Sequence, residues 1–137
     1  DLKAVFIGTS SGTTAQALSE YFKEINREIE MHIVQTASCH PISIDFVDSL
    51  VDEVSIADAI VDHNAIRKDK IIKLINESRG SGWIATNEQI KSAQELTKKH
   101  TGLAISTNSA LSIAGLMQAV YTGKEWSGSV ACIICGD

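Results

Sequence analysis

The sequence has little proline, few aromatic residues and too few cysteines for a disulfide framework. A single proline in 137 residues, with a hydrophobic content of 44%, is typical of an ordered globular domain and excludes a proline-rich linker. The three cysteines, Cys39, Cys132 and Cys135, cannot all pair with one another, which favours a reducing compartment. We therefore expect one domain over residues 1–137, with a cytoplasmic location.

Long apolar runs and blocks of like charge are also absent. No apolar run approaches the ~18 residues that cross a membrane, and Asp1-Leu2-Lys3 does not begin a signal peptide. The net charge of −5 comes from interspersed acidic and basic residues with no basic patch. We expect neither a membrane nor a nucleic acid as a partner.

Two patterns that bind metals in other proteins lack the geometry for it here. Cys132 and Cys135 form a C-x-x-C within a β-branched run, and residues three apart on a strand face opposite sides. They chelate one metal only if the strand ends between them. The acidic residues between Asp45 and Asp62 lack the spacing of a calcium loop, which favours a solvated acidic face. We therefore expect no metal site.

The most informative stretch is residues 4–18. An apolar run short enough for a buried strand changes, at residues 8–14, to small or hydroxylated residues and then to a helical pattern. A loop of Gly, Ser and Thr lets the backbone approach a ligand, and the next helix points free N–H groups at it. The candidate residues of this phosphate site are Ser10, Ser11, Gly12, Thr13 and Thr14. In the simpler alternative, these hydroxyl residues only cap the helix.

Helical and strand patterns alternate along the rest of the chain. We expect helices over residues 15–29, 64–79, 86–102 and 110–121, strands over 31–35, 83–85, 103–105 and 130–134, and a short helix over 46–51. Asn64 is expected to cap the second helix, and Thr86 with Gln89 forms a capping box. This order predicts an α/β fold, a three-layer αβα sandwich with a mainly parallel sheet.

In such folds ligands bind outside the carboxyl ends of the strands. The loops at residues 8–14 and 106–109 and the end of the chain, Cys135-Gly136-Asp137, are all expected at that edge.

Four segments in the right order resemble a known family. Ser10-Ser11-Gly12-Thr13-Thr14-x-x-Ala17 resembles a phosphate loop of the form G-x-G-G-T-x-x-G, and residues 80–90 resemble a glycine pair, strand and acidic helix start. Residues 106–116 are similar to an E-P-S-S-A-A-A-L-A-G-L run, and residues 133–136 to a closing strand. The family is that of the pyridoxal-phosphate enzymes of the tryptophan-synthase-β fold (fold type II), with threonine synthase, threonine and serine dehydratases and cysteine synthase.

The resemblance implies pyridoxal 5'-phosphate as cofactor and a small amino acid as substrate. It implies that Ser10 to Thr14 hold the cofactor's phosphate and that Cys135 meets its pyridine nitrogen. The implied reaction is a β/γ-elimination or replacement by an amino-acid lyase or synthase. Cys135 favours the dehydratase type, whereas Ala57-Asp58 and residues 108–116 favour threonine synthase, so both alternatives stay open. Thr13 and Ala17 stand where the family has glycine, which predicts a tighter phosphate loop.

The family's Schiff-base lysine precedes the phosphate loop, and this sequence begins only three residues before its first strand. We therefore expect the larger, cofactor-phosphate-binding domain, without catalytic residues of its own. Its partners would be the missing N-terminal half of the enzyme and further copies in a homo-oligomer. The competing hypothesis is a non-catalytic α/β module that binds another phosphorylated small ligand.

Overall fold

The computed structural model describes residues 1–135. The elements, in chain order, are β1 (Leu2–Gly8), α1 (Thr13–Glu24), β2 (Glu30–Thr36), the 3₁₀ turn η1 (Ser43–Phe46), α2 (Lys68–Glu77), β3 (Ser81–Ala85), α3 (Asn87–Thr101), α4 (Thr107–Tyr121) and β4 (Ser129–Ile133). None of the helices in this range combines the length and the apolar character that a membrane crossing needs.

The four strands form one sheet in the order β3-β2-β1-β4. Every neighbouring pair is parallel, and Ile7 of β1 lies opposite Ile33 of β2 and Ile133 of β4. The carboxyl ends of all four strands therefore meet at one edge, as the sequence predicts.

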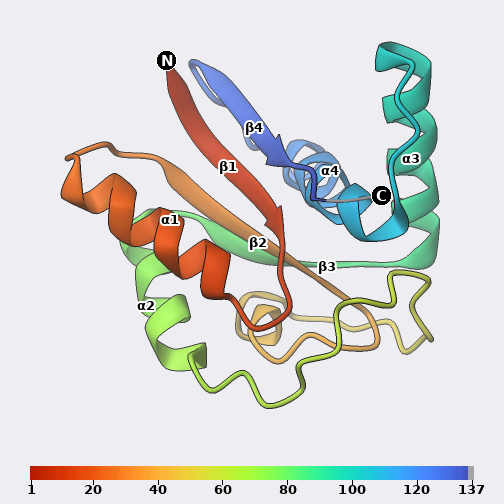
Figure 1. Cartoon of the computed structure of the whole chain (residues 1–137), viewed down its shortest axis with the longest axis horizontal. Helices are drawn as coiled ribbons and strands as arrows, with labels where there is room; N and C mark the ends of the chain where they lie inside the picture. Colours follow the sequence, from red (N-terminus) through yellow and green to blue (C-terminus); the bar gives the residue numbers. More distant parts are fainter. Residues whose placement is uncertain (136–137) are drawn as a thin grey trace.

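Helices cover both faces of the sheet, with α1 and α2 on one side and α3 and α4 on the other (Figure 1). The alternation of side chains along β1 separates the two cores: Val5 and Ile7 pack toward α1 and α2, whereas Ala4 and Phe6 pack toward α4. Because β1 is buried on both faces, its sequence is a continuous apolar run. The predicted three-layer αβα sandwich is confirmed.

The strand expected over residues 103–105 does not form. These residues connect α3 to α4, which pack against each other on one face of the sheet, so the segment never reaches a strand edge. Its polar groups bond to helices instead: the carbonyl of Ile105 accepts a hydrogen bond from Gln94 Nε2 at 2.7 Å. Leu103 is exposed as a result.

Several helix boundaries also differ from those expected. The first helix ends at Glu24, because Asn26 adopts a positive φ of 51° that breaks the helical backbone. The short helix near residue 46 is only the turn η1. Asn64 does not cap α2, which begins at Lys68, and the fourth helix begins at Thr107, three residues early. The capping box of Thr86 and Gln89 is confirmed.

A buried polar cluster lies between β2 and α4, at the end of the sheet where the strands begin. Its centre is His32, whose ring is fully buried and stacks on Phe6 at a centroid distance of 4.3 Å. Trp83 Nε1 donates to His32 Nδ1 at 3.2 Å, so His32 Nε2 carries the ring hydrogen and donates to Glu30 Oε2 at 3.0 Å. Burial lowers the pKa of His32 to about 4, which keeps the ring neutral.

Candidate functional site

The loop between β1 and α1 turns sharply at Gly12, which occupies the cap position of α1 with a φ of 85°. No side chain caps this helix end, so the alternative in which the hydroxyl residues merely cap α1 fails. Ser11 and Thr13 instead bond to each other through their hydroxyl oxygens at 3.1 Å. The first turn of α1 carries no acidic residue that would repel an anion.

The backbone N–H groups of residues 10–15 donate no hydrogen bond to any of the described residues, 1–135. They surround a small cavity of about 170 Å³ that is lined by residues 7–15 alone. Free N–H donors at the positive end of a helix form a ready site for an anion. The geometry of this loop therefore fits a phosphate group.

A basic residue that the sequence motifs did not indicate lies beside this loop. Arg67, exposed just before α2, donates from Nη1 to Thr13 Oγ1 at 3.5 Å. Its guanidinium makes no ion pair within residues 1–135 and adds positive charge to the phosphate loop. Arg67 is far from Thr13 along the chain, so no local spacing in the sequence indicates that the two residues are in contact. The only sequence clue is a single arginine near the start of a helix.

The side chain of Ser10 binds a neighbouring segment of the backbone. Its Oγ accepts hydrogen bonds from the backbone N–H groups of Val61 and Asp62 at 3.3 and 3.2 Å, which fixes the long connection between β2 and α2 to the loop. Its carbonyl accepts from Nε2 of the fully buried Gln35 at 3.2 Å. The backbone N–H of Ser10 thus makes no hydrogen bond within residues 1–135, while its hydroxyl holds a neighbouring segment.

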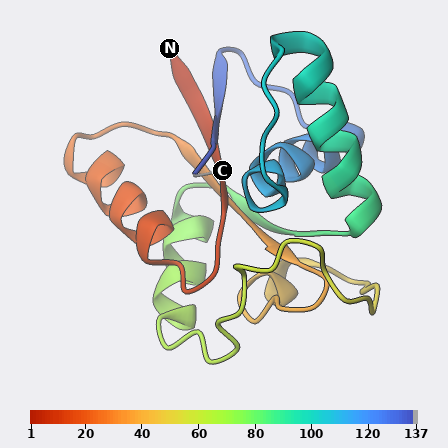
Figure 2. The same cartoon turned by 45° about the vertical axis from the view of Figure 1, so that its right-hand side comes forward.

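That connection crosses the same edge of the sheet (Figure 2). Asn87 Oδ1 accepts from the backbone N–H of Ile56 at 2.8 Å, and Asn108 Oδ1 accepts from the backbone N–H of Ala59 at 3.1 Å. Ser10, Asn87 and Asn108 lie at or next to the N-termini of three helices, so one segment is fastened to all three.

Gly12 is required by the packing of the loop against α2. A Cβ at this position would lie 2.1 Å from Ile71 Cδ1 of α2. The hydrogen that replaces it therefore points into the core between α1 and α2. Gly12 shapes the loop by allowing close packing and a left-handed turn, not by leaving room for the ligand.

Cys135 follows β4 at the same edge and is exposed. Its carbonyl accepts from Ser109 Oγ at 2.9 Å, which fixes the end of β4 against the first turn of α4. Since β4 lies beside β1, this places Cys135 on the edge that carries the phosphate loop. Gly136 and Asp137, also expected there, lie outside the described residues.

The C-x-x-C pair does not form a metal site within residues 1–135, where no group of three potential metal ligands comes together. The strand ends at Ile133, between the two cysteines. Cys132 packs on the α4 side of the sheet, where burial raises the pKa of its thiol to about 11. Such a thiol stays protonated and is a poor metal ligand.

Similar architectures occur among solved structures. An aspartate racemase described as pyridoxal 5'-phosphate-dependent has 21% sequence identity and a TM-score of 0.74, and the match covers 99% of this chain and 44% of that one. A serine racemase from Dictyostelium discoideum has 18% identity and a TM-score of 0.76, with 99% and 44% covered. Threonine deaminase isoform 2 from Solanum lycopersicum has 17% identity and a TM-score of 0.75, with 99% and 38% covered. The chain thus spans less than half the length of these structures.

No curated protein sequence matches this chain. The family model described as "Pyridoxal-phosphate dependent enzyme" matches residues 1–136, nearly the whole chain. The fold, the free amide donors of residues 10–15 and this match agree with the resemblance seen in the sequence. The chain belongs to the family of pyridoxal-phosphate-dependent enzymes.

Proposed function

We propose that this chain is the cofactor-phosphate-binding part of a pyridoxal-phosphate-dependent amino-acid lyase or synthase. One observation carries the proposal: the backbone N–H groups of residues 10–15 make no hydrogen bond within residues 1–135, and these residues line a cavity at the N-terminus of α1. This part of the enzyme supplies the phosphate site, Ser10 to Thr14, and the pyridine-nitrogen contact, Cys135.

In this proposal the backbone of the loop binds the phosphate and no side chain of the loop takes part in chemistry. The Arg67 guanidinium adds a charge-assisted contact on the exposed side. The Cys135 thiol would contact the pyridine nitrogen as a weak hydrogen-bond partner, donating to it or accepting from it without fully protonating it. When bound, the cofactor supplies an electron sink for a carbanion at the amino acid's Cα.

The reaction we favour is elimination or replacement at the β or γ carbon, of the threonine synthase or the dehydratase type. The similar structures are named for aspartate, serine and threonine, which supports an amino-acid substrate. The Schiff-base lysine, on this proposal, belongs to an N-terminal half of the enzyme, and the assembled protein is a cytoplasmic homo-oligomer.

A titration followed by amide chemical shifts tests the phosphate site. Inorganic phosphate and pyridoxal phosphate should shift the amides of residues 8–15 most, because those groups donate to the anion. Arg67→Gln should weaken binding about fivefold, since it removes one exposed charge-assisted contact. Lys98→Gln, an equal charge change on the exposed side of α3, should leave binding unchanged.

Further arms of the titration separate the cofactor site from a site for another phosphorylated ligand. Pyridoxal phosphate, but not ribose 5-phosphate, should also shift Ile134 and Cys135, and Cys135→Ser should leave the phosphate contribution unchanged. If the largest shifts fall away from residues 8–15, the phosphate site is misassigned. If ribose 5-phosphate produces every shift that pyridoxal phosphate does, the competing module is the better description.

The chain's own lysines should not form the covalent link to the cofactor. None of them is buried, and Lys3, Lys23, Lys68, Lys70, Lys73 and Lys124 are held in ion pairs with carboxylates. Such solvated amines lack the desolvation that activates a Schiff-base lysine. Borohydride reduction in the presence of pyridoxal phosphate, followed by peptide mapping, should give only scattered labelling; stoichiometric labelling of one lysine would overturn this expectation.

A further inference from the structure

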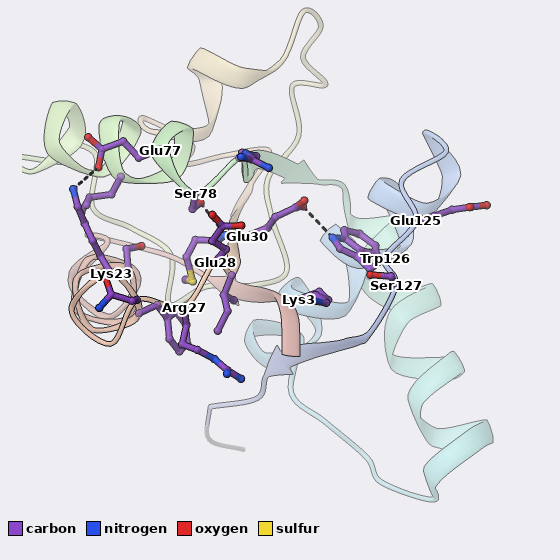
Figure 3. A pocket seen from close by; sticks show the side chains of 17 residues that line it. Lys3, Lys23, Arg27, Glu28, Glu30, Glu77, Ser78, Glu125, Trp126 and Ser127 are labelled. Carbon is purple, nitrogen blue, oxygen red and sulfur yellow. Dashed lines mark hydrogen bonds and ion pairs between the residues drawn. The ribbon is translucent and has the colours of Figure 1, made fainter. Parts of the chain in front are cut away.

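A hollow lies at the edge of the sheet opposite the phosphate loop. Its volume is about 760 Å³, within the range of about 300–1,000 Å³ of small-molecule sites. It opens where the strands begin: Lys3 lies near the start of β1, Glu30 begins β2, and Ser127 precedes β4 (Figure 3). We call it the amino-edge pocket. It shares no residue with the phosphate loop.

Apolar side chains contribute to the lining of this pocket. The partly exposed ones come from α1, α2 and the turn before β4, and they are Phe22, Leu74 and Trp126, whereas Ile29 and Met31 are buried. Trp126 is held in place, because its Nε1 donates to Glu30 Oε2 at 3.0 Å, as Figure 3 shows. The same oxygen also accepts from Lys124 Nζ and His32 Nε2, each at 3.0 Å. The aromatic wall is thus preorganised, which lowers the entropic cost of binding a ligand.

Charged residues of both signs line the pocket, and half of them are already paired. Lys3 bonds Asp1, Lys23 bonds Glu77, and Glu30 bonds Lys124. The remaining charged lining residues make no ion pair within residues 1–135; they are Arg27, Glu28, Arg79 and Glu125. Figure 3 shows the Glu125 side chain directed away from the hollow, so the unpaired charged groups that the rim offers to a ligand are those of Arg27, Glu28 and Arg79.

The C-termini of two helices add partial negative charge to the rim of this pocket. Helices α1 and α2 both end at the pocket, at Glu24 and Glu77, and the C-terminus of a helix attracts a cationic group. A purely anionic or purely cationic ligand would pair with only some of the charged groups of the rim and would be repelled by the others. An amphoteric ligand satisfies both.

The geometry points to a second binding site in the amino-edge pocket, for a zwitterionic aminocarboxylate with a large apolar side chain. Its carboxylate pairs with the Arg27 and Arg79 guanidiniums, its ammonium with the Glu28 carboxylate, and its apolar body packs on the wall at Trp126. This site is independent of the cofactor site and lies at the other edge of the sheet.

L-phenylalanine is the probe that combines all three features. It should shift the backbone amides of residues 29–31 and the indole N–H of Trp126, with the indole of Trp83, which does not line the pocket, as an internal reference. Phenethylamine lacks the carboxylate, 3-phenylpropionate lacks the amine and glycine lacks the apolar body. Each should bind at least tenfold more weakly, because each loses one class of contact.

The three arginines of the chain provide matched variants. The double variant Arg27→Gln with Arg79→Gln should weaken L-phenylalanine binding at least tenfold, while Arg67→Gln at the phosphate loop should leave it unchanged. Phosphate binding should weaken in Arg67→Gln and stay unchanged in the double variant. The two proposed sites can therefore be tested separately. The proposal is overturned if millimolar L-phenylalanine shifts no pocket residue, if the partial analogues bind equally well, or if the double variant binds as the parent does.

Discussion

Gly12→Ala is expected to lower the free energy of unfolding by about 3 kcal/mol, the sum of two separate costs. The backbone there has a φ of 85°, which costs a residue with a Cβ about 1–2 kcal/mol. The new methyl would also lie 2.1 Å from Ile71 Cδ1, and overpacking a core adds about 1–3 kcal/mol. Phosphate binding should weaken with it, because the methyl forces the loop away from α2. Urea unfolding measures the first effect and amide shifts measure the second.

Two further variants separate packing from backbone strain. Ile71→Val removes the Cδ1 atom that the new methyl meets, so the double variant with Gly12→Ala should lose less stability than the two single changes added together. Gly102 has a similar φ of 76° with no atom within 4 Å of an added Cβ, so Gly102→Ala should cost only the backbone part, about 1 kcal/mol. Strict additivity between Gly12→Ala and Ile71→Val would show that the two residues do not clash.

The parts of the fold that the sequence predicts well are those set by local patterns. The apolar run before Gly8 and the small residues after it specify a buried strand and a tight loop, and the capping box at Thr86 specifies a helix start. Alternation of such units leaves few topologies, which is why a parallel sheet with ligand groups at its carboxyl edge follows from the sequence.

The failures arise where contacts distant in sequence decide the outcome. Leu103 to Ile105 has the composition of a strand, but α3 and α4 pack directly on each other and leave it no sheet edge. Asn64 has the chemistry of a helix cap, yet Asp62 Oδ1 accepts its N–H and that of Ala65, which forms a separate turn before α2.

The candidate site also combines features that local sequence patterns predict with features that distant contacts decide. The free amides of residues 10–15 follow from the strand–loop–helix pattern, whereas Arg67 reaches Thr13 only through the packing of α2 beside α1. The sequence indicates Gly12 as part of the candidate phosphate site, but its need for glycine comes from Ile71, a residue of the same distant helix. Sequence patterns therefore indicate where the candidate anion site lies, and tertiary contacts determine what shapes it.

Acid is expected to destabilise the protein well above the range in which carboxylates are protonated, because His32 is buried as a neutral ring. An ordinary histidine has a pKa of 6.5, and burial lowers that of His32 to about 4. Between these values the unfolded chain binds a proton that the folded chain does not. The stability is therefore complete above pH 6.5, falls as the pH drops toward about 4, and loses about 3 kcal/mol in total.

The loss should be followed by urea unfolding at a series of pH values between 7 and about 4. His32→Gln keeps a donor for Glu30 and an acceptor for Trp83 but does not titrate, so its stability should change much less over this range, even if it is lower at pH 7. His100→Gln, at the exposed end of α3, should keep the full slope. Below this range Glu30 adds a second loss: burial raises the pKa of its carboxyl, but hydrogen bonds from Trp126, Lys124 and His32 outweigh burial and hold it below the usual 4.5. A slope that is identical in the parent and in His32→Gln would show that His32 is not the group responsible.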